Sequence, residues 1–227
     1  MKYSEFENIM STTRMGRYLV ACNNNSKRAM TLYRKNLQLS QELFTIISCF
    51  EIALRNSIDQ HYLTIHGNNW LREAASTGGM FDNQRCRLTA DNINEAIQKL
   101  NANYTHNKLV AELGFGFWRY MFAPHQFLLA GQSLLAIFPA KPQSTPGMQY
   151  NASFVFNQLS KVNNIRNRIA HHEPICFISG QPVKSTTYAR QHYTLLLQLF
   201  QWMTIDEGKL LYGLDHINMI CNKIDTL

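Results

Sequence analysis

The sequence predicts an all-α protein, and three observations support that prediction. Apolar residues recur along most of the chain at intervals of three and four, the period of a helix, rather than two. The 11 glycines and 6 prolines among 227 residues are too few for a disordered or fibrous chain. Hydrophobic residues make up 45% of the chain, enough for a packed core. We expect a single domain, residues 1–227, built as a bundle of long helices.

The first part of the chain is expected to hold basic helices in residues 1–36 and a core helix in residues 37–66. Ser26 and Ser40 each have the residue type that caps the N-terminus of a helix. After Ser40, apolar residues share one helical face that runs toward Ile65. This apolar stripe comprises Leu43, Ile46, Ile47, Phe50, Leu54 and Ile58. The pattern predicts a new helix beginning at Ser40.

Shorter elements are expected in the middle of the chain. Residues 67–88 contain three glycines, which predict a loop. Thr89 and Thr105 are the predicted caps of two further helices. The stretch "ELGFGFW", residues 112–118, interrupts the helical pattern with two glycines. Residues 127–138 then predict a buried helix that the proline at position 139 ends.

Two long core helices are expected within residues 151–206, after a linker at residues 139–150 that is rich in proline and serine. The first is predicted to run from about residue 151 to His172, because Pro174 disfavours the helical conformation in the residue before it. A loop, "ISGQPVKS", separates it from the second core helix, and a short helix follows near the C-terminus.

Several classes of protein are disfavoured by the sequence. The N-terminus, "MKYSEFENIM", lacks the apolar segment of a signal peptide. The nearly apolar run at residues 127–138 is shorter than the ~20 residues that span a bilayer. The five cysteines form no CxxC pair, so neither a disulfide framework nor a thiolate metal site is indicated. We expect a cytoplasmic protein with no membrane partner, no metal and no cofactor.

The charge is positive and unevenly distributed. The chain carries 22 Lys and Arg against 15 Asp and Glu, a net charge of +7. Residues 1–40 hold seven basic residues against two acidic ones, while the last thirty residues are net acidic. A basic segment of this kind is typical of a protein that binds a polyanion such as RNA. Arg34 and Lys35 are the candidates for RNA contacts in this segment.

The most unusual stretch is "IRNRIAHHEP", residues 165–174. At 100° per residue, Arg166 falls within the apolar stripe of its helix, and Asn167 and His171 share a face at the edge of that stripe. A guanidinium stays charged, so Arg166 must be paired or must face a space that admits an anion. If the stripes of the two core helices face each other, Glu51 could neutralise Arg166. Arg55, Asn56 and His171 would then surround an anion-sized space.

Simpler interpretations of the same residues remain open. Histidine and arginine near a helix C-terminus are favoured by the helix dipole, so the stretch could be only a well-capped helix end. His172 could cap the helix or assist His171, and Glu173 could orient a histidine or meet solvent. Arg168, on the opposite side of the helix, is expected to meet solvent or the RNA backbone.

A second arrangement of the same kind occurs within the chain. Arg55 and Asn56 are followed by His61, which gives an RN-x4-H pattern that could complete a site with the first. The helical wheel places His61 beside Leu43, within the apolar stripe. His61 is therefore either part of an in-chain site or a core histidine.

Several motifs in the same order resemble one known family. They are "RMGRYL" (14–19), "TLYRKNLQLSQELF" (31–44), "FEIALRNSI" (50–58), "GNNWL" (67–71), "VAELGFGFWRYMF" (110–122) and "RNRIAHHEPI" (166–175). Together they resemble the Abi-like (abortive-infection) proteins of the HEPN superfamily, which comprises α-helical ribonucleases and RNA-binding domains. The resemblance extends over nearly the whole chain and implies a HEPN-like helical bundle with additional N-terminal and middle helices.

The resemblance implies a function and a set of site residues. HEPN ribonucleases carry an Arg, often followed by Asn, with a His four to six positions on, which Arg166, Asn167 and His171 match. The resemblance further implies a metal-independent RNA-cleaving site formed where two such motifs meet in a homodimer. The protein would be a toxin or phage-defence effector, restrained by an RNA or protein antitoxin. The alternatives are a non-catalytic RNA-binding or dimerising HEPN module and a helical scaffold in which Arg166 only pairs with Glu51.

Overall fold

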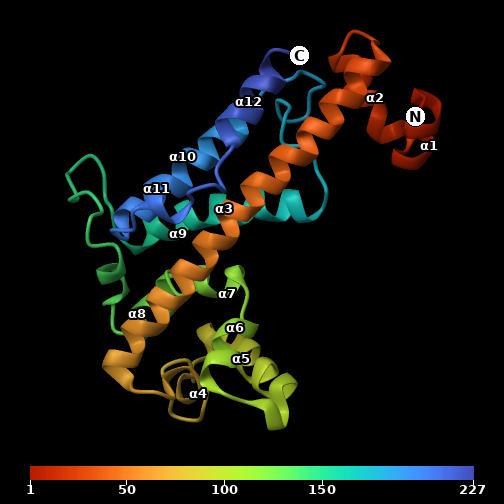
Figure 1. Cartoon of the computed structure of the whole chain (residues 1–227). Coiled ribbons are helices and arrows are strands. Elements are labelled where there is room, and N and C mark those ends of the chain that lie inside the picture. The colour runs from red at the N-terminus through yellow and green to blue at the C-terminus, as the bar shows by residue number, and fades with distance from the viewer. The chain divides into compact units, whose positions relative to one another are not determined.

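The computed structural model describes all residues, 1–227, and it is all-helical (Figure 1). No strand is present, and the only β-type contacts are two isolated bridges, Thr145 with Met148 and Phe177 with Lys184. The all-α prediction is therefore confirmed. The α-helices are α1 (Tyr3–Met10), α2 (Thr12–Ala21), α3 (Ser26–His66), α4 (Trp70–Ala74), α5 (Arg87–Leu100), α6 (His106–Glu112), α7 (Phe115–Tyr120), α8 (Pro124–Leu129), α9 (Ala152–Ala170), α10 (Thr187–Trp202), α11 (Glu207–Leu210) and α12 (Ile217–Asp225).

The chain forms two compact units, where the sequence predicts one domain. Unit 1 comprises Met1–Ser48, Asn164–Gln198 and Glu207–Leu227. Unit 2 comprises Cys49–Asn163 and Leu199–Asp206. Each unit therefore combines segments that are far apart in the sequence, and each is described by itself below.

Helix α3 is a single uninterrupted helix of 41 residues (Figure 1). It begins after Asn25, whose Oδ1 accepts a hydrogen bond from the Arg28 amide at 3.0 Å, so Asn25 rather than Ser26 provides the cap. The predicted helix start at Ser40 is wrong, because the backbone continues through it. Helix propensity and the buried stripe outweigh the capping tendency of one serine.

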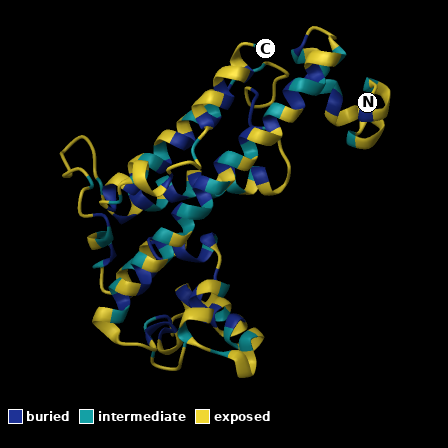
Figure 2. Ribbon diagram, in the orientation of Figure 1, coloured by how far each residue is buried: buried dark blue, intermediate teal, exposed yellow.

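The predicted apolar stripe of α3 is confirmed. All six of its residues are at most 1% exposed, whereas Ile65 beyond them is half exposed. Figure 2 shows buried positions recurring along α3 between exposed ones. By length and composition alone, α3 could also cross a membrane, with an 18-residue window of mean hydropathy 1.2. Core helices of soluble proteins have the same composition, so the expected absence of a membrane partner stays a prediction.

Two predictions for the middle of the chain need correction. Thr89 lies inside α5, which begins at Arg87, and its hydroxyl accepts a hydrogen bond from Gln126 Nε2 at 3.0 Å. Residues 127–138 do not form one helix, because α8 ends at Leu129 and a short 3-10 helix follows at Leu134–Ile137. Between them Gly131 and Gln132 have φ values of 84° and 57°, which no α-helix accommodates.

Other predicted boundaries are confirmed to within a few residues. Thr105 caps α6 by accepting a hydrogen bond from the Lys108 amide at 3.2 Å. Residues 139–150 contain no helix and form the expected linker. The two core helices of the C-terminal part are α9 and α10. The loop prediction for residues 67–88 is only partly right, because this stretch also contains α4, a 3-10 helix at Gln84–Cys86 and the start of α5.

In unit 1, aromatic rings join the N-terminal helices to the segment after α9. The ring of Tyr18 on α2 packs edge-on against Phe177 and Tyr33, with centroid distances of 4.9 and 5.1 Å. Phe6 on α1 packs against Tyr33 at 5.4 Å. All four rings are at most 5% exposed, so α1, α2 and the first part of α3 share one core with residues 171–186.

In unit 2, a buried polar cluster lies among apolar residues. Asp59 Oδ1 accepts hydrogen bonds from Trp70 Nε1 at 2.8 Å and lies 2.7 Å from His106 Nε2. Asp59 is only 6% exposed, and these contacts satisfy a carboxylate that would otherwise be costly to bury. Elsewhere in this unit Phe50 packs edge-on against Phe200 at 5.3 Å.

Candidate functional site

The RN-x3-H motif lies on the last turns of α9, within unit 1. Ile165 and Ile169 are buried, and Arg166 between them is partly buried. Asn167 and His171 are solvent-exposed, and the His171 amide donates to the Asn167 carbonyl at 2.9 Å. The helix therefore holds an exposed amide and an exposed imidazole one turn apart, next to a partly buried guanidinium.

Helix α9 ends at Ala170, and the turn that follows it contains two characteristic hydrogen bonds. The Glu173 amide donates to the Arg168 carbonyl at 2.8 Å, and the His172 amide donates to the Ile169 carbonyl at 2.9 Å. This is the Schellman pattern, and His172 occupies its left-handed position with φ of 57°. Glycine is the usual residue there, so His172 is in a strained backbone conformation.

Arg168 was expected to meet solvent or the RNA backbone, but its side chain forms contacts within the protein. Its side chain is 25% exposed, and Nε forms an ion pair with Glu173 Oε2 at 3.1 Å. Nη2 donates to the Pro174 carbonyl at 3.0 Å, and the guanidinium lies 4.8 Å from the ring centroid of Tyr188. Arg168 and Glu173 thus hold the turn after α9, which the helical wheel could not reveal because their partners lie beyond the helix.

Residues after α9 are fixed by hydrogen bonds from the N-terminal helices. Asn36, which is 3% exposed, accepts a hydrogen bond from the Ile175 amide at 2.9 Å. Arg14 Nη1 donates to the His172 carbonyl at 2.7 Å. Arg17 donates to the carbonyls of Ile178 and Gln181 at distances of 2.7 to 3.2 Å. The turn that carries the two histidines is therefore supported by α2 and α3.

A cleft lies between α2 and this turn, within unit 1. Its volume is about 350 Å³, in the range of pockets that hold small ligands. It is lined by Ser11, Thr13, Arg14, Arg17, Tyr18, His172, Glu173 and Pro174. His172, which follows His171 directly in the chain, lines the cleft, whereas Arg166, Asn167 and His171 themselves do not. Its two arginines outnumber its one carboxylate, which is already paired with Arg168.

Sequence reasoning did not assign Arg14 and Arg17 to the site. Both belong to the "RMGRYL" stretch and to the basic segment, yet neither was singled out. Their spacing of three places both on one face of a helix, which is the signal that could have indicated a shared site. That this face meets the end of α9 depends on tertiary packing.

The other predicted site residues lie in different places. Glu51, Arg55 and Asn56 belong to unit 2, so the proposed pairing of Glu51 with Arg166 stays a prediction. Arg55 and Glu51 are partly buried, and Asn56 is exposed.

His61 also belongs to unit 2. Its Nε2 lies 2.8 Å from Ser133 Oγ, and its ring packs against Tyr62 at a centroid distance of 5.1 Å. Burial lowers the pKa of His61 below 6.5, and the nearby His66 lowers it further. These contacts favour the interpretation of His61 as a core histidine.

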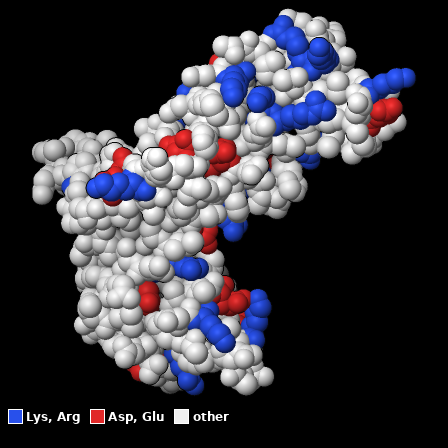
Figure 3. Space-filling view, in the orientation of Figure 1, with Lys and Arg blue, Asp and Glu red and all other residues white.

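The basic residues of the N-terminal segment gather on one region of unit 1. Figure 3 shows Lys and Arg side chains over α1, α2 and the first part of α3. Arg34 is exposed and its guanidinium lies 5.1 Å from the ring centroid of Phe6, while Lys35 Nζ donates to Gln38 Oε1 at 2.8 Å. Arg34 thus remains accessible to a polyanion, and Lys35 is partly buried.

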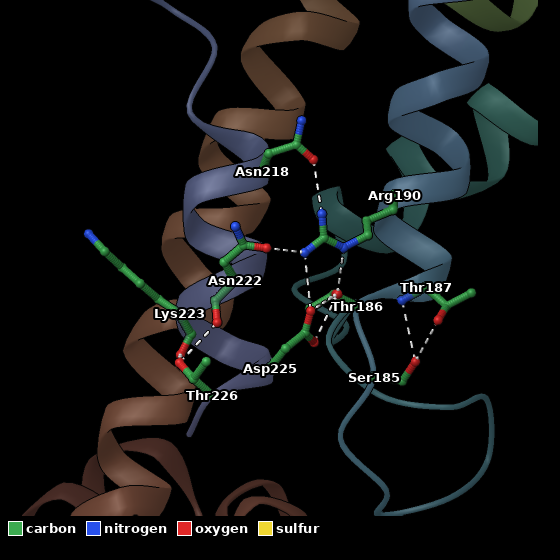
Figure 4. A network of polar contacts seen from close by, with 9 residues as sticks. All are labelled: Ser185, Thr186, Thr187, Arg190, Asn218, Asn222, Lys223, Asp225 and Thr226. Carbon is green, nitrogen blue, oxygen red and sulfur yellow. Dashed lines mark hydrogen bonds and ion pairs between the residues drawn. The ribbon is translucent and has the colours of Figure 1, made fainter.

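One arginine of unit 1 serves a structural role. Arg190 on α10 donates to Asn218 at 2.9 Å, to Asn222 at 2.7 Å and to Asp225 at 3.1 Å, and all three lie on α12 (Figure 4). Its Nε donates to Thr186 Oγ1 at 3.0 Å. These bonds occupy the guanidinium and join α12 to α10, so Arg190 is not a candidate for binding a ligand.

Metal-ligating side chains do not cluster. No group of three or more His, Cys, Asp or Glu side chains is placed to hold a metal ion. All five cysteines are free thiols, and four of them are buried. Burial raises the pKa of Cys176 to about 12, so this thiol is not a nucleophile at neutral pH.

Comparison with models of known protein families, with curated proteins and with solved structures finds no match to this chain. The resemblance to Abi-like HEPN proteins therefore rests on the sequence motifs alone.

Proposed function

We propose that the protein is a metal-independent endoribonuclease that acts as a toxin or phage-defence effector. The observation that carries the proposal is the exposure of Asn167 and His171 one turn apart at the end of α9, beside the partly buried Arg166. These three residues fit the RN-x3-H pattern of the HEPN ribonucleases that the chain resembles.

The residue types match cleavage that uses the ribose 2′-OH as nucleophile. An imidazole can act as a general base or a general acid, so His171 could take the proton of the 2′-OH or give one to the leaving oxygen. The 2′-oxygen forms a bond to phosphorus, and the bond from phosphorus to the 5′-oxygen breaks. The products are a 2′,3′-cyclic phosphate and a 5′-OH. Arg166 could stabilise the charge that develops on the phosphate oxygens.

One chain contains one RN-x3-H motif. Two such motifs would meet in a symmetric homodimer, the commonest closed assembly. The working form is therefore proposed to be a homodimer, with an RNA or protein antitoxin as the restraining partner and the cytoplasm as the site of action.

The test is cleavage of labelled single-stranded RNA by the purified protein in EDTA. We expect products with 2′,3′-cyclic phosphate ends, no cleavage of DNA of the same sequence, and loss of cleavage in Arg166→Ala and His171→Ala. His125→Ala is the matched control, because His125 is an exposed histidine in unit 2. Cleavage by His171→Ala at the wild-type rate would contradict the site assignment.

A second candidate function is RNA binding without cleavage. It is favoured by the basic residues over α1, α2 and the start of α3 (Figure 3), which suffice for contacts to phosphates. Retention of intact RNA on the wild-type protein, with no products, would support this function over the first.

A further inference from the structure

We propose that the cleft between α2 and the end of α9 binds one nucleotide of a single-stranded RNA, next to His171. This inference rests on the proposed action on RNA and names a subsite for it. The subsite consists of Arg14, Arg17, Tyr18, His172 and Pro174, which all line the cleft.

The basic side of the cleft offers donors for a phosphate. A guanidinium has five N–H donors, and Arg14 uses one of its nitrogens, Nη1, for the His172 carbonyl. Arg17 uses Nε and Nη2 for the carbonyls of the following loop, which leaves Nη1. The Arg17 guanidinium is held through two nitrogens and lies 4.7 Å from the ring centroid of Phe177, whereas Arg14 is held through one nitrogen. Two guanidiniums on one helix face suit the recognition of a phosphodiester.

The opposite side of the cleft suits a nucleoside. Pro174 provides apolar surface beside the almost fully buried Tyr18, and the exposed His172 also lines the cleft. Unstacked bases of single-stranded RNA commonly stack on histidine or on a guanidinium plane. A volume of about 350 Å³ is in the range of pockets that hold small ligands, and a single nucleotide is a ligand of that class.

The left-handed conformation of His172 gives the proposal a second, independent support. A φ of 57° is strained for histidine, and glycine would adopt it without strain. Residues in such conformations cluster at active sites and ligand-binding sites. An imidazole that stacks on the bound base is such a use.

The experiment measures binding of a labelled single-stranded RNA with 2′-O-methyl riboses, which lack the attacking hydroxyl and stay intact. Fluorescence anisotropy with the full chain at several salt concentrations gives the dissociation constant and its salt slope. Arg14→Gln and Arg17→Gln should each weaken binding by about five- to tenfold and reduce the salt slope by roughly 0.7, the value for one phosphate contact on a single strand. Arg85→Gln, an exposed arginine in unit 2, is the charge-matched control and should change binding less than about twofold.

His172→Gly separates binding from folding, because it relieves backbone strain while it removes the imidazole. We expect it to fold at least as well as wild type and to bind about fivefold more weakly or worse. The proposal is overturned if the wild type does not bind this RNA, or if the three cleft variants bind it as Arg85→Gln does.

The two proposals can fail separately. Cleft-dependent binding of the 2′-O-methyl RNA, without cleavage of ordinary RNA, would support the subsite and contradict the ribonuclease. Cleavage that is lost in His171→Ala, with RNA affinity unchanged in the cleft variants, would support the ribonuclease and contradict the subsite.

Discussion

Among single residues at the end of α9, some side chains are positioned by the helix and others by the turn that follows it. Asn167 and His171 follow from helical periodicity, which places them on one exposed face. Arg168 and Glu173 pair with each other across the turn, and Arg14 binds the His172 carbonyl. Asn167 and His171 are thus exposed and Arg166 is partly buried, while their neighbours maintain the backbone that positions them.

The strain at His172 predicts an increase in stability on substitution by glycine. His172→Gly should raise the free energy of unfolding by roughly 0.5 to 1 kcal/mol, because a left-handed φ disfavours side chains with a Cβ. His172→Val should lower it, since β-branched residues tolerate this conformation worst. Urea unfolding followed by circular dichroism measures both. A His172→Gly variant less stable than wild type would contradict the left-handed backbone conformation of His172.

The lowered pKa of His61 predicts a stability that falls with acidification. In the unfolded chain His61 binds a proton near its ordinary pKa of 6.5, and in the folded chain only at lower pH. The unfolded state therefore binds more protons between these values, so the contribution of His61 is present above pH 6.5 and is lost as the pH falls below it. Between pH 7.5 and 5.5, the free energy of unfolding measured with urea should decrease less for His61→Gln than for wild type.

The control is His125→Gln, which removes an exposed histidine of unit 2. It should retain the wild-type decrease in stability between pH 7.5 and 5.5. An equal decrease in the free energy of unfolding for wild type and His61→Gln would contradict a pKa difference between folded and unfolded His61.

At the scale of elements, the sequence predicted the helices where the apolar period was long and missed boundaries that tertiary contacts decide. The buried stripe from Leu43 to Ile58 was recognisable because six residues repeat the helical period. The break at Ser40 was wrong, since a serine that can cap a helix is also tolerated within one. The turn at Gly131 and Gln132 was missed because apolar residues on both sides resemble one continuous helix.

Ser40 either lies inside α3 or caps a separate helix, and the two cases predict opposite effects of Ser40→Ala on the free energy of unfolding. If Ser40 lies inside a helix, Ser40→Ala should raise the free energy of unfolding by up to about 0.5 kcal/mol, and Ser40→Pro should lower it by about 3 kcal/mol or more. If Ser40 were a cap, Ser40→Ala would instead cost about 1 kcal/mol. Urea unfolding of the two variants distinguishes these cases. Loss of stability in Ser40→Ala would argue against the uninterrupted helix.

Parts of the candidate site were predictable and others were not. The sequence alone indicated Arg166, Asn167 and His171, because their spacing and the proline at position 174 define a helix end. It could not indicate the cleft with Arg14, since its two walls are more than 150 residues apart in the chain. Pairings across such separations depend on packing, and the residue pattern of a single sequence does not reveal them.

At the scale of the whole molecule, unit 1 contains both the RN-x3-H motif and the basic N-terminal segment. The chain has a net charge of +7, and seven of its 22 Lys and Arg residues lie within residues 1–40, over α1, α2 and the start of α3 (Figure 3). A polyanion attracted to this surface would therefore meet the same unit that carries His171. We propose that His171, on this unit, transfers a proton during cleavage of RNA.

The most direct measurement is the single-turnover rate constant for cleavage of single-stranded RNA in EDTA, compared between wild type, His171→Ala and His125→Ala. Removal of a general acid or base typically costs 10²- to 10⁴-fold in rate. We predict a decrease of at least about 100-fold for His171→Ala and none for His125→Ala. A His171→Ala rate constant within about threefold of the wild-type value, or wild-type protein that leaves RNA intact, would contradict the claim.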